Sequence, residues 1–183
     1  MKRRSPWLAF SACLLAGMGS LGANAKEAIT SYFAPNRAYS VQIHRNAETD
    51  LFRAELIRTK KRKVLTSLSD GSPRGDSLAV WSPDSRRVAI YCDQRRGGST
   101  TTYEVSGTST VGLTMPEIAV LVEKDANKKV WRWSYNAEIP IRWDKNGDLI
   151  LKSKGRFQDG NDPAKGVFFD FEYLVRVAFD TDR

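Results

Sequence analysis

Residues 78–90 read L-A-V-W-S-P-D-S-R-R-V-A-I and give the strongest structural signal in the sequence. Two apolar segments with period-two patterning flank a four-residue turn, which is typical of neighbouring antiparallel strands. Pro83 fixes φ, and the side chains of Asp84 and Ser85 can bond to nearby backbone amides, so the turn has a physical cause. We therefore predict strands at residues 77–81 and 87–92.

The same alternation of apolar and polar residues continues along most of the chain. At residues 118–123 a β-branched apolar run favours a strand, while Thr114 and Glu117 form a capping box that leaves a helix as the alternative. Asn146-Gly147 is a strong hairpin signal. The fold class is therefore all-β, with antiparallel sheets and at most one short helix. Further strands are predicted at residues 39–45, 51–58, 63–67, 100–105, 130–135, 139–143, 148–157 and 167–179.

A degenerate copy of the first stretch occurs at residues 140–151, P-I-R-W-D-K-N-G-D-L-I-L, with Trp143 placed 62 residues after Trp81. On these residues the chain resembles the TolB-type, WD-like β-propeller repeat, whose signature is W-S-P-D-G-K/R before a short apolar strand. Ser85 stands where Gly is usual, and the second copy keeps Gly147 but lacks Ser-Pro-Asp. The resemblance implies blade-like hairpins and no catalytic residue.

Length limits this architecture. The chain has 183 residues, of which 27% are charged and 41% hydrophobic, an ordinary globular mixture that excludes a fibre or a multi-span membrane protein. A propeller takes about four to eight blades, so about two blade-like units do not close a ring. We expect residues 26–183 to form one all-β domain, either an incomplete propeller or a β-sandwich, with a monomer favoured over an oligomer.

Residues 1–25 have the pattern of a cleaved signal peptide. Three basic residues at positions 2–4 precede an apolar stretch at 7–21, and Ala23-Asn24-Ala25 is a small-x-small cleavage site. The apolar stretch is short for a membrane anchor, which needs about 20 residues, and the residues before Cys13 make a poor lipoprotein signal. The sequence predicts a periplasmic or secreted protein, processed near Ala25 and without a membrane span.

Charge and cysteine content fit export. Removal of the signal takes away three basic residues and no acidic ones, so the net charge falls from +8 to +5. This surplus is mild and gives no indication of nucleic-acid binding. Only Cys92 remains, so no intramolecular disulfide is possible. We predict that Cys92 is a small buried apolar residue.

The sequence contains few candidates for chemistry. His44 is the one histidine, too few for a zinc site, and no phosphate loop, dinucleotide fingerprint or Gly-x-Ser-x-Gly motif is present. Residues 144–148, D-K-N-G-D, resemble the first half of a calcium loop, but Leu149 and Gly155 occupy the positions that require Gly and Glu. We interpret them as a hairpin turn and expect no cofactor, no metal and no catalytic activity.

An aromatic cluster is the candidate ligand or partner surface: Trp131, Trp133, Tyr135 and Trp143. By strand parity the first three share one face, and rigid aromatic rings supply contact area at low entropic cost. The alternative is that this face belongs to the core, with Arg132 and Ser134 in solvent.

The resulting hypothesis is an exported binding or scaffolding module of the cell envelope, whose partner is another envelope protein or a glycan. Two alternatives stay open. One is a secreted enzyme inhibitor that uses a loop at residues 97–102, and the other is an envelope hydrolase that uses His44. The basic clusters at residues 58–63 and 95–96 are expected to be solvated turns, with an anionic surface as the alternative.

Overall fold

The structure is a computed structural model that describes residues 27–46, 48–49, 52–71, 76–94, 96–161 and 163–179. The expected signal segment, with Cys13 and the cleavage site near Ala25, lies outside the described residues, as do Leu51 and Arg95. Within the described part, no helix has the length and apolar character needed to cross a membrane.

The first sheet is an antiparallel meander with the strand order β1-β2-β3-β4. A short 3-10 turn, Thr59–Lys61, connects β3 to β4 and ends at Arg62 with a positive φ of 47°. The strands predicted at residues 39–45, 51–58 and 63–67 are confirmed within the described part, whereas the first strand was not predicted. Their bounds are Ala28–Phe33 (β1), Tyr39–Arg45 (β2), Phe52–Arg58 (β3) and Lys63–Gly71 (β4).

The second sheet has seven strands in the order β11-β10-β9-β7-β6-β5, with β8 paired to β7. It consists of two antiparallel meanders, β5 to β8 and β9 to β11, which meet through the parallel pairs Gly97↔Asn136 and Gly98↔Ala137. The all-β class is confirmed. The strands are Ser77–Trp81 (β5), Arg87–Gln94 (β6), Gly97–Ser106 (β7), Ser109–Leu113 (β8), Val130–Trp143 (β9), Leu149–Asp159 (β10) and Phe168–Val177 (β11).

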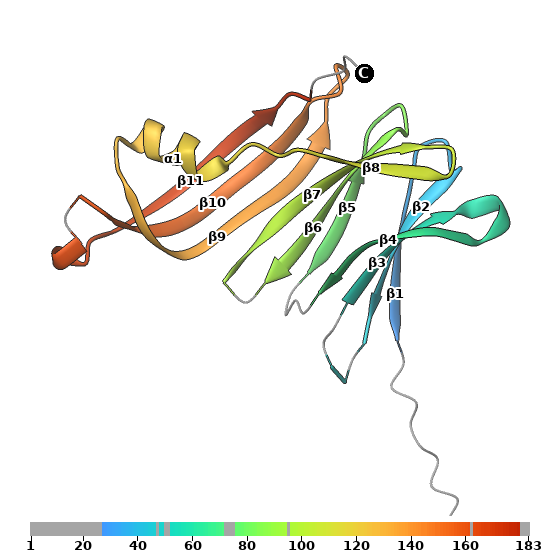
Figure 1. The fold of residues 1–183 in the computed structure, drawn as a ribbon, viewed down its shortest axis with the longest axis horizontal. Helices are drawn as coiled ribbons and strands as arrows, with labels where there is room; N and C mark the ends of the chain where they lie inside the picture. Colours follow the sequence, from blue (N-terminus) through green and yellow to red (C-terminus); the bar gives the residue numbers. More distant parts are fainter. Residues whose placement is uncertain are drawn as a thin grey trace, which may run out of the picture.

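The described residues therefore form three blade-like units: β1 to β4 form the first, β5 to β8 the second and β9 to β11 the third. Figure 1 shows the three units side by side in sequence order, from the first unit on the right to the third on the left. The first strand of each unit ends in an aromatic residue, namely Phe33, Trp81 and Trp143, and the same kind of turn follows.

The three turns share one backbone conformation. The fifth residue, counted from the aromatic, has positive φ in each case: 56° at Arg37, 63° at Ser85 and 85° at Gly147. Its amide donates to the carbonyl oxygen of the second residue at 2.8, 2.9 and 3.1 Å, respectively. The sequence repeat at Trp81 and Trp143 thus has a third member, residues 33–37, which the sequence reading missed.

The tryptophans of this repeat connect neighbouring units. The Trp81 indole donates from Nε1 to the Tyr32 carbonyl oxygen at 2.9 Å, and Trp143 donates in the same way to Val80 at 2.9 Å. Each acceptor is the residue just before the aromatic of the preceding unit. The contact between the first and second units is therefore repeated between the second and third.

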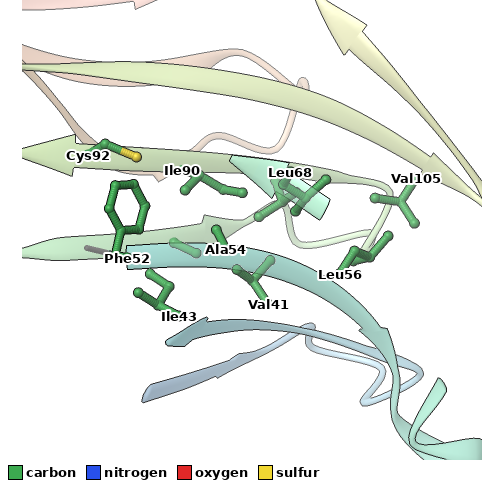
Figure 2. Close-up of a cluster of buried hydrophobic side chains, with 11 residues drawn as sticks. Val41, Ile43, Phe52, Ala54, Leu56, Leu68, Ile90, Cys92 and Val105 are labelled. Atoms are coloured by element: carbon green, nitrogen blue, oxygen red, sulfur yellow. The ribbon is translucent and has the colours of Figure 1, made fainter. Parts of the chain in front are cut away.

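Two buried clusters hold the units together. In the first, the inner faces of the first two units meet, and Figure 2 shows side chains from both sheets pointing toward one another. Cys92 belongs to this cluster at 8% exposure, which confirms its predicted burial. The members of the first cluster are Val41, Ile43, Phe52, Ala54, Leu56, Leu68, Ala79, Val88, Ile90, Cys92 and Val105.

The second cluster joins the third unit to the helix and to the back of the second unit. Residues expected as a strand form the helix α1 (Ile118–Ala126), so the strand prediction at 118–123 was wrong. Ile118 and Val122, one turn apart, are buried on the cluster, and this burial outweighs the weak helix preference of β-branched residues. Its members are Ala89, Ile118, Val122, Trp143, Leu149, Leu151, Phe157 and Val177.

Candidate binding surface

The four aromatic residues predicted as a surface do not lie together. Trp143 is buried at 4% exposure, and Trp133 packs edge-on against Phe157 and Phe171 at ring-centroid distances of 5.7 and 5.6 Å. Trp131 and Tyr135 are exposed, at 64% and 38%. The first pair is part of the core and the second pair is on the surface.

Irregularities in β9 explain this separation. Tyr135 pairs with Arg156, and Trp133 pairs with Phe157, with a register shift between them. A second shift lies between the pairs made by Gln158 and Asp159. Each extra residue reverses the alternation of side chains, so the prediction of one shared face for Trp131, Trp133 and Tyr135 was wrong.

The side of β9 to β11 that faces away from the second cluster is here called the outer face. Its residues alternate with the buried residues of β10 and occupy the matching register positions of β9 and β11. The outer face comprises Arg132, Tyr135, Ala137, Ile139, Arg142, Ile150, Lys152, Lys154, Arg156, Gln158, Phe168, Asp170, Glu172, Leu174 and Arg176.

This face is basic and carries exposed apolar groups. Six of its side chains are basic and two are acidic. The acidic pair is engaged within the strands, because Lys152 lies 2.6 Å from Glu172 and Arg156 lies 3.6 Å from Asp170. Because the basic side chains outnumber the acidic ones, an excess of positive charge is left on the outer face.

An aromatic and arginine patch occupies one end of the outer face. The Arg156 guanidinium lies 5.4 Å from the centre of the Phe168 ring, a cation–π distance, and Tyr135 is the register partner of Arg156 on the other side. Phe168 is 44% exposed. Sequence reasoning missed Arg156 and Phe168, although the apolar and charged alternation of residues 168–177 was the signal that places Phe168 opposite the core face.

At the other end of the face an ion-pair network fixes the third repeat turn. Arg176 donates from Nε to Asp148 at 2.6 Å and from Nη2 to Asp144 at 2.8 Å. Burial raises the pKa of Asp144, but amides of the turn and the Arg176 charge outweigh it and leave that pKa below its usual value. Asp144 Oδ1 accepts from the Asn146 and Asp148 amides at 2.8 and 3.1 Å, which is the hairpin interpretation of this segment.

His44 lies on strand β2 of the first unit, with its ring between two carboxylates. Its Nδ1 is 3.3 Å from Glu27 Oε1 and its Nε2 is 3.3 Å from Glu55 Oε2, although neither contact has hydrogen-bond geometry. In a catalytic triad one ring nitrogen faces a hydroxyl, whereas both nitrogens of His44 face carboxylates. The described residues contain no cluster of three or more His, Cys, Asp or Glu side chains suited to a metal ion.

Of two other segments considered in the sequence analysis, one differs from expectation and one agrees with it. Residues 97–102, considered as an inhibitory loop, belong to strand β7. The basic turn at residues 58–63 is mostly exposed, consistent with a solvated turn.

Comparison with known proteins adds a limited likeness of fold. No protein-family model matches the chain, and no curated protein matches its sequence. Among solved structures, TolB from Acinetobacter baumannii matches 83% of this chain with a TM-score of 0.42 and 14% identity. This chain spans about a third (33%) of the length of that protein.

Proposed function

We propose that the protein is an exported binding module of the cell envelope that recognises an acidic surface of another envelope protein through the outer face of its third unit. One observation carries the proposal: the exposed side chains of Tyr135, Arg156 and Phe168 lie together on one face of the third unit. Tyr, Phe and Arg are enriched at protein interfaces and supply much of their binding energy.

The charge of this face defines the partner. The face has six basic and two acidic groups, and although Arg176 is already paired with Asp144 and Asp148, the remaining excess of basic groups favours a surface rich in Asp and Glu. Complementary charge speeds association and excludes basic partners. A protein is favoured over a glycan as the partner. The two rings available for stacking, Tyr135 and Phe168, are separated by Arg156, so they do not form one continuous platform for a sugar.

Export is the second part of the proposal and rests on residues 1–25, whose charged, apolar and small-residue regions have the order of a signal peptide. Mass spectrometry of the protein from its native host should find a mature chain that begins at Lys26. A full-length chain retained in the cytoplasm would contradict the localisation.

Site-specific photo-crosslinking tests the surface. A photoreactive residue at Tyr135 should capture an envelope protein in intact cells, whereas the same group at exposed Thr108, in the turn of the second unit, should not. Arg156→Glu should weaken the isolated complex by about 30-fold, a typical effect for a binding hot spot. Equal capture at both positions, or a complex that Arg156→Glu leaves unchanged, would refute the proposed surface.

A further inference from the structure

In the part of the chain that the structure describes, the third unit has one strand fewer than the other two. The first and second units each have four strands, while the third ends with β11, at the edge of the seven-stranded sheet. Within the described residues, only β10 pairs with β11. The backbone groups of β11 that point away from β10 thus form a row of donors and acceptors without a strand partner in that part of the chain.

Apart from the charged side chains of Asp170, Glu172 and Arg176, this edge lacks the usual protections. β11 is ten residues long, contains no proline, and pairs with β10 over ten positions without a register shift. The edge strands β1 and β5 have six and five residues, and β4 pairs through two irregularities. Long and regular edges with apolar side chains are the ones that accept another strand. Leu174, the seventh of the ten residues of β11, is 74% exposed.

The side-chain pattern of β11 indicates which strand would pair with this edge, namely a second copy of β11 itself. On the outer face Leu174 is flanked two residues away by Glu172 on one side and Arg176 on the other. An antiparallel copy of the same strand, centred on Leu174, places Leu opposite Leu. The same register places Glu172 of each copy opposite Arg176 of the other, because paired positions in an antiparallel arrangement have a constant sum.

We propose that two copies of this protein associate through their β11 edges as a two-fold symmetric, antiparallel pair with Leu174 on the axis. Cross-strand pairs of opposite charge stabilise such a sheet, and the two leucines remove their exposed side chains from water. Lys152 and Asp148, which already contact Glu172 and Arg176 at 2.6 Å, extend each charge pair into a network. This association goes beyond the proposed function and does not depend on it.

Sedimentation equilibrium of the mature protein over a wide concentration range provides the first test. We expect a monomer–dimer equilibrium, and Leu174→Lys should raise its dissociation constant by about tenfold or more, since two ammonium groups would meet on the axis. Leu121→Lys is the matched control, because Leu121 is also an exposed leucine (44%) but lies on α1. Circular dichroism checks that both variants are folded.

Cysteine crosslinking tests the register. Leu174→Cys should form a disulfide-linked dimer under mild oxidation, because opposed Cβ atoms in an antiparallel pair lie about 5 Å apart. Phe168→Cys is the control on the same strand and face. In the proposed register its two copies lie about 40 Å apart, at twelve residues of about 3.3 Å each, so no dimer should form.

The outcomes show whether β11 pairs with a second copy of the chain, with a strand of another protein, or with no strand. A chain that stays monomeric at all concentrations overturns the proposal, and so does a dimer that Leu174→Lys leaves intact. Crosslinking at Phe168→Cys in place of Leu174→Cys overturns the register and with it the Glu172–Arg176 pairing. A monomer whose β11 instead captures a strand of another envelope protein overturns the self-association while leaving the proposed function standing.

Discussion

The indole hydrogen bond of Trp143 joins the second and third units, and the substitution Trp143→Phe tests its contribution directly. Trp143 is 4% exposed, donates to the Val80 carbonyl oxygen at 2.9 Å, and stacks at a tilt against Phe179 with 5.5 Å between ring centres. Phenylalanine keeps an apolar ring at this position but removes the donor.

The expected loss of stability has two parts. A partly buried carbonyl that loses its donor costs about 1–3 kcal/mol. The smaller ring removes apolar contact from the second cluster, which costs about 1 kcal/mol more. Trp143→Phe should therefore lower the free energy of unfolding by about 2–4 kcal/mol. At about 2–4 °C per kcal/mol for a chain of this size, the melting temperature should fall by about 5–15 °C.

Urea unfolding followed by far-UV circular dichroism measures this difference without depending on tryptophan emission. Trp131→Phe is the matched control, because Trp131 is 64% exposed and the same chemical change should alter stability by no more than about 0.5 kcal/mol. If the two variants have equal stability, the indole contact does not hold the second and third units together, and the reasoning from the repeated hydrogen bond fails.

Three further variants test the turn, the core and the junction between the meanders. Burial raises the pKa of Asp84, but hydrogen bonds from the Ser82 hydroxyl at 2.6 Å and from a turn amide outweigh it and hold this pKa below its usual value. The ionised form of Asp84 therefore stabilises the fold above about pH 4, and this contribution is lost as pH falls through the lowered pKa. In urea titrations across pH, the free energy of unfolding of Asp84→Asn should fall less in acid than that of the parent protein. Parallel pH profiles for the two proteins would contradict this. Ser153 is fully buried and its hydroxyl has no hydrogen-bond partner among the described residues, so Ser153→Ala should match the parent or gain up to about 1 kcal/mol in thermal unfolding, and a clear loss would count against it. At Gly97, where φ is +129°, a Cβ would lie 1.6 Å from a backbone oxygen of β9, so Gly97→Ala should cost more than about 3 kcal/mol in urea unfolding, while Gly112→Ala, with open space around its Cβ, should be nearly neutral.

The repeat turn is the part of the fold that the sequence reveals most directly, because its conformation is set by adjacent residues. At Ser82 to Ser85 the proline, the aspartate and the positive φ are local properties, and the same holds for the Asn146-Gly147 turn. The first copy, at Phe33, escaped recognition for a structural reason. In the described part of the chain no unit precedes it, so this position has no carbonyl to bond and phenylalanine serves as well as tryptophan.

The helix α1 could not be predicted in this way, since its stability comes from distant residues. A short β-branched segment favours a strand when judged alone. In the structure Ile118 and Val122 are buried in the second cluster, which also contains Leu149 and Leu151, while Val120 is 53% exposed. Tertiary burial of one helical face therefore decided the outcome, and the predicted capping box did not form, because Glu117 itself precedes the first helical turn without a side-chain cap.

The candidate surface depends on the same kind of non-local information. Simple alternation along residues 131–135 predicts three aromatic rings on one face, and a regular β9 would have to bury or expose them together. The two shifts of register against β10 release that constraint. They let Trp133 enter the core beside Phe157 while Tyr135 stays outside opposite Arg156. The irregularities of β9 thus divide one aromatic run between two tasks, the packing of the third unit and the exposed patch that we assign to partner binding.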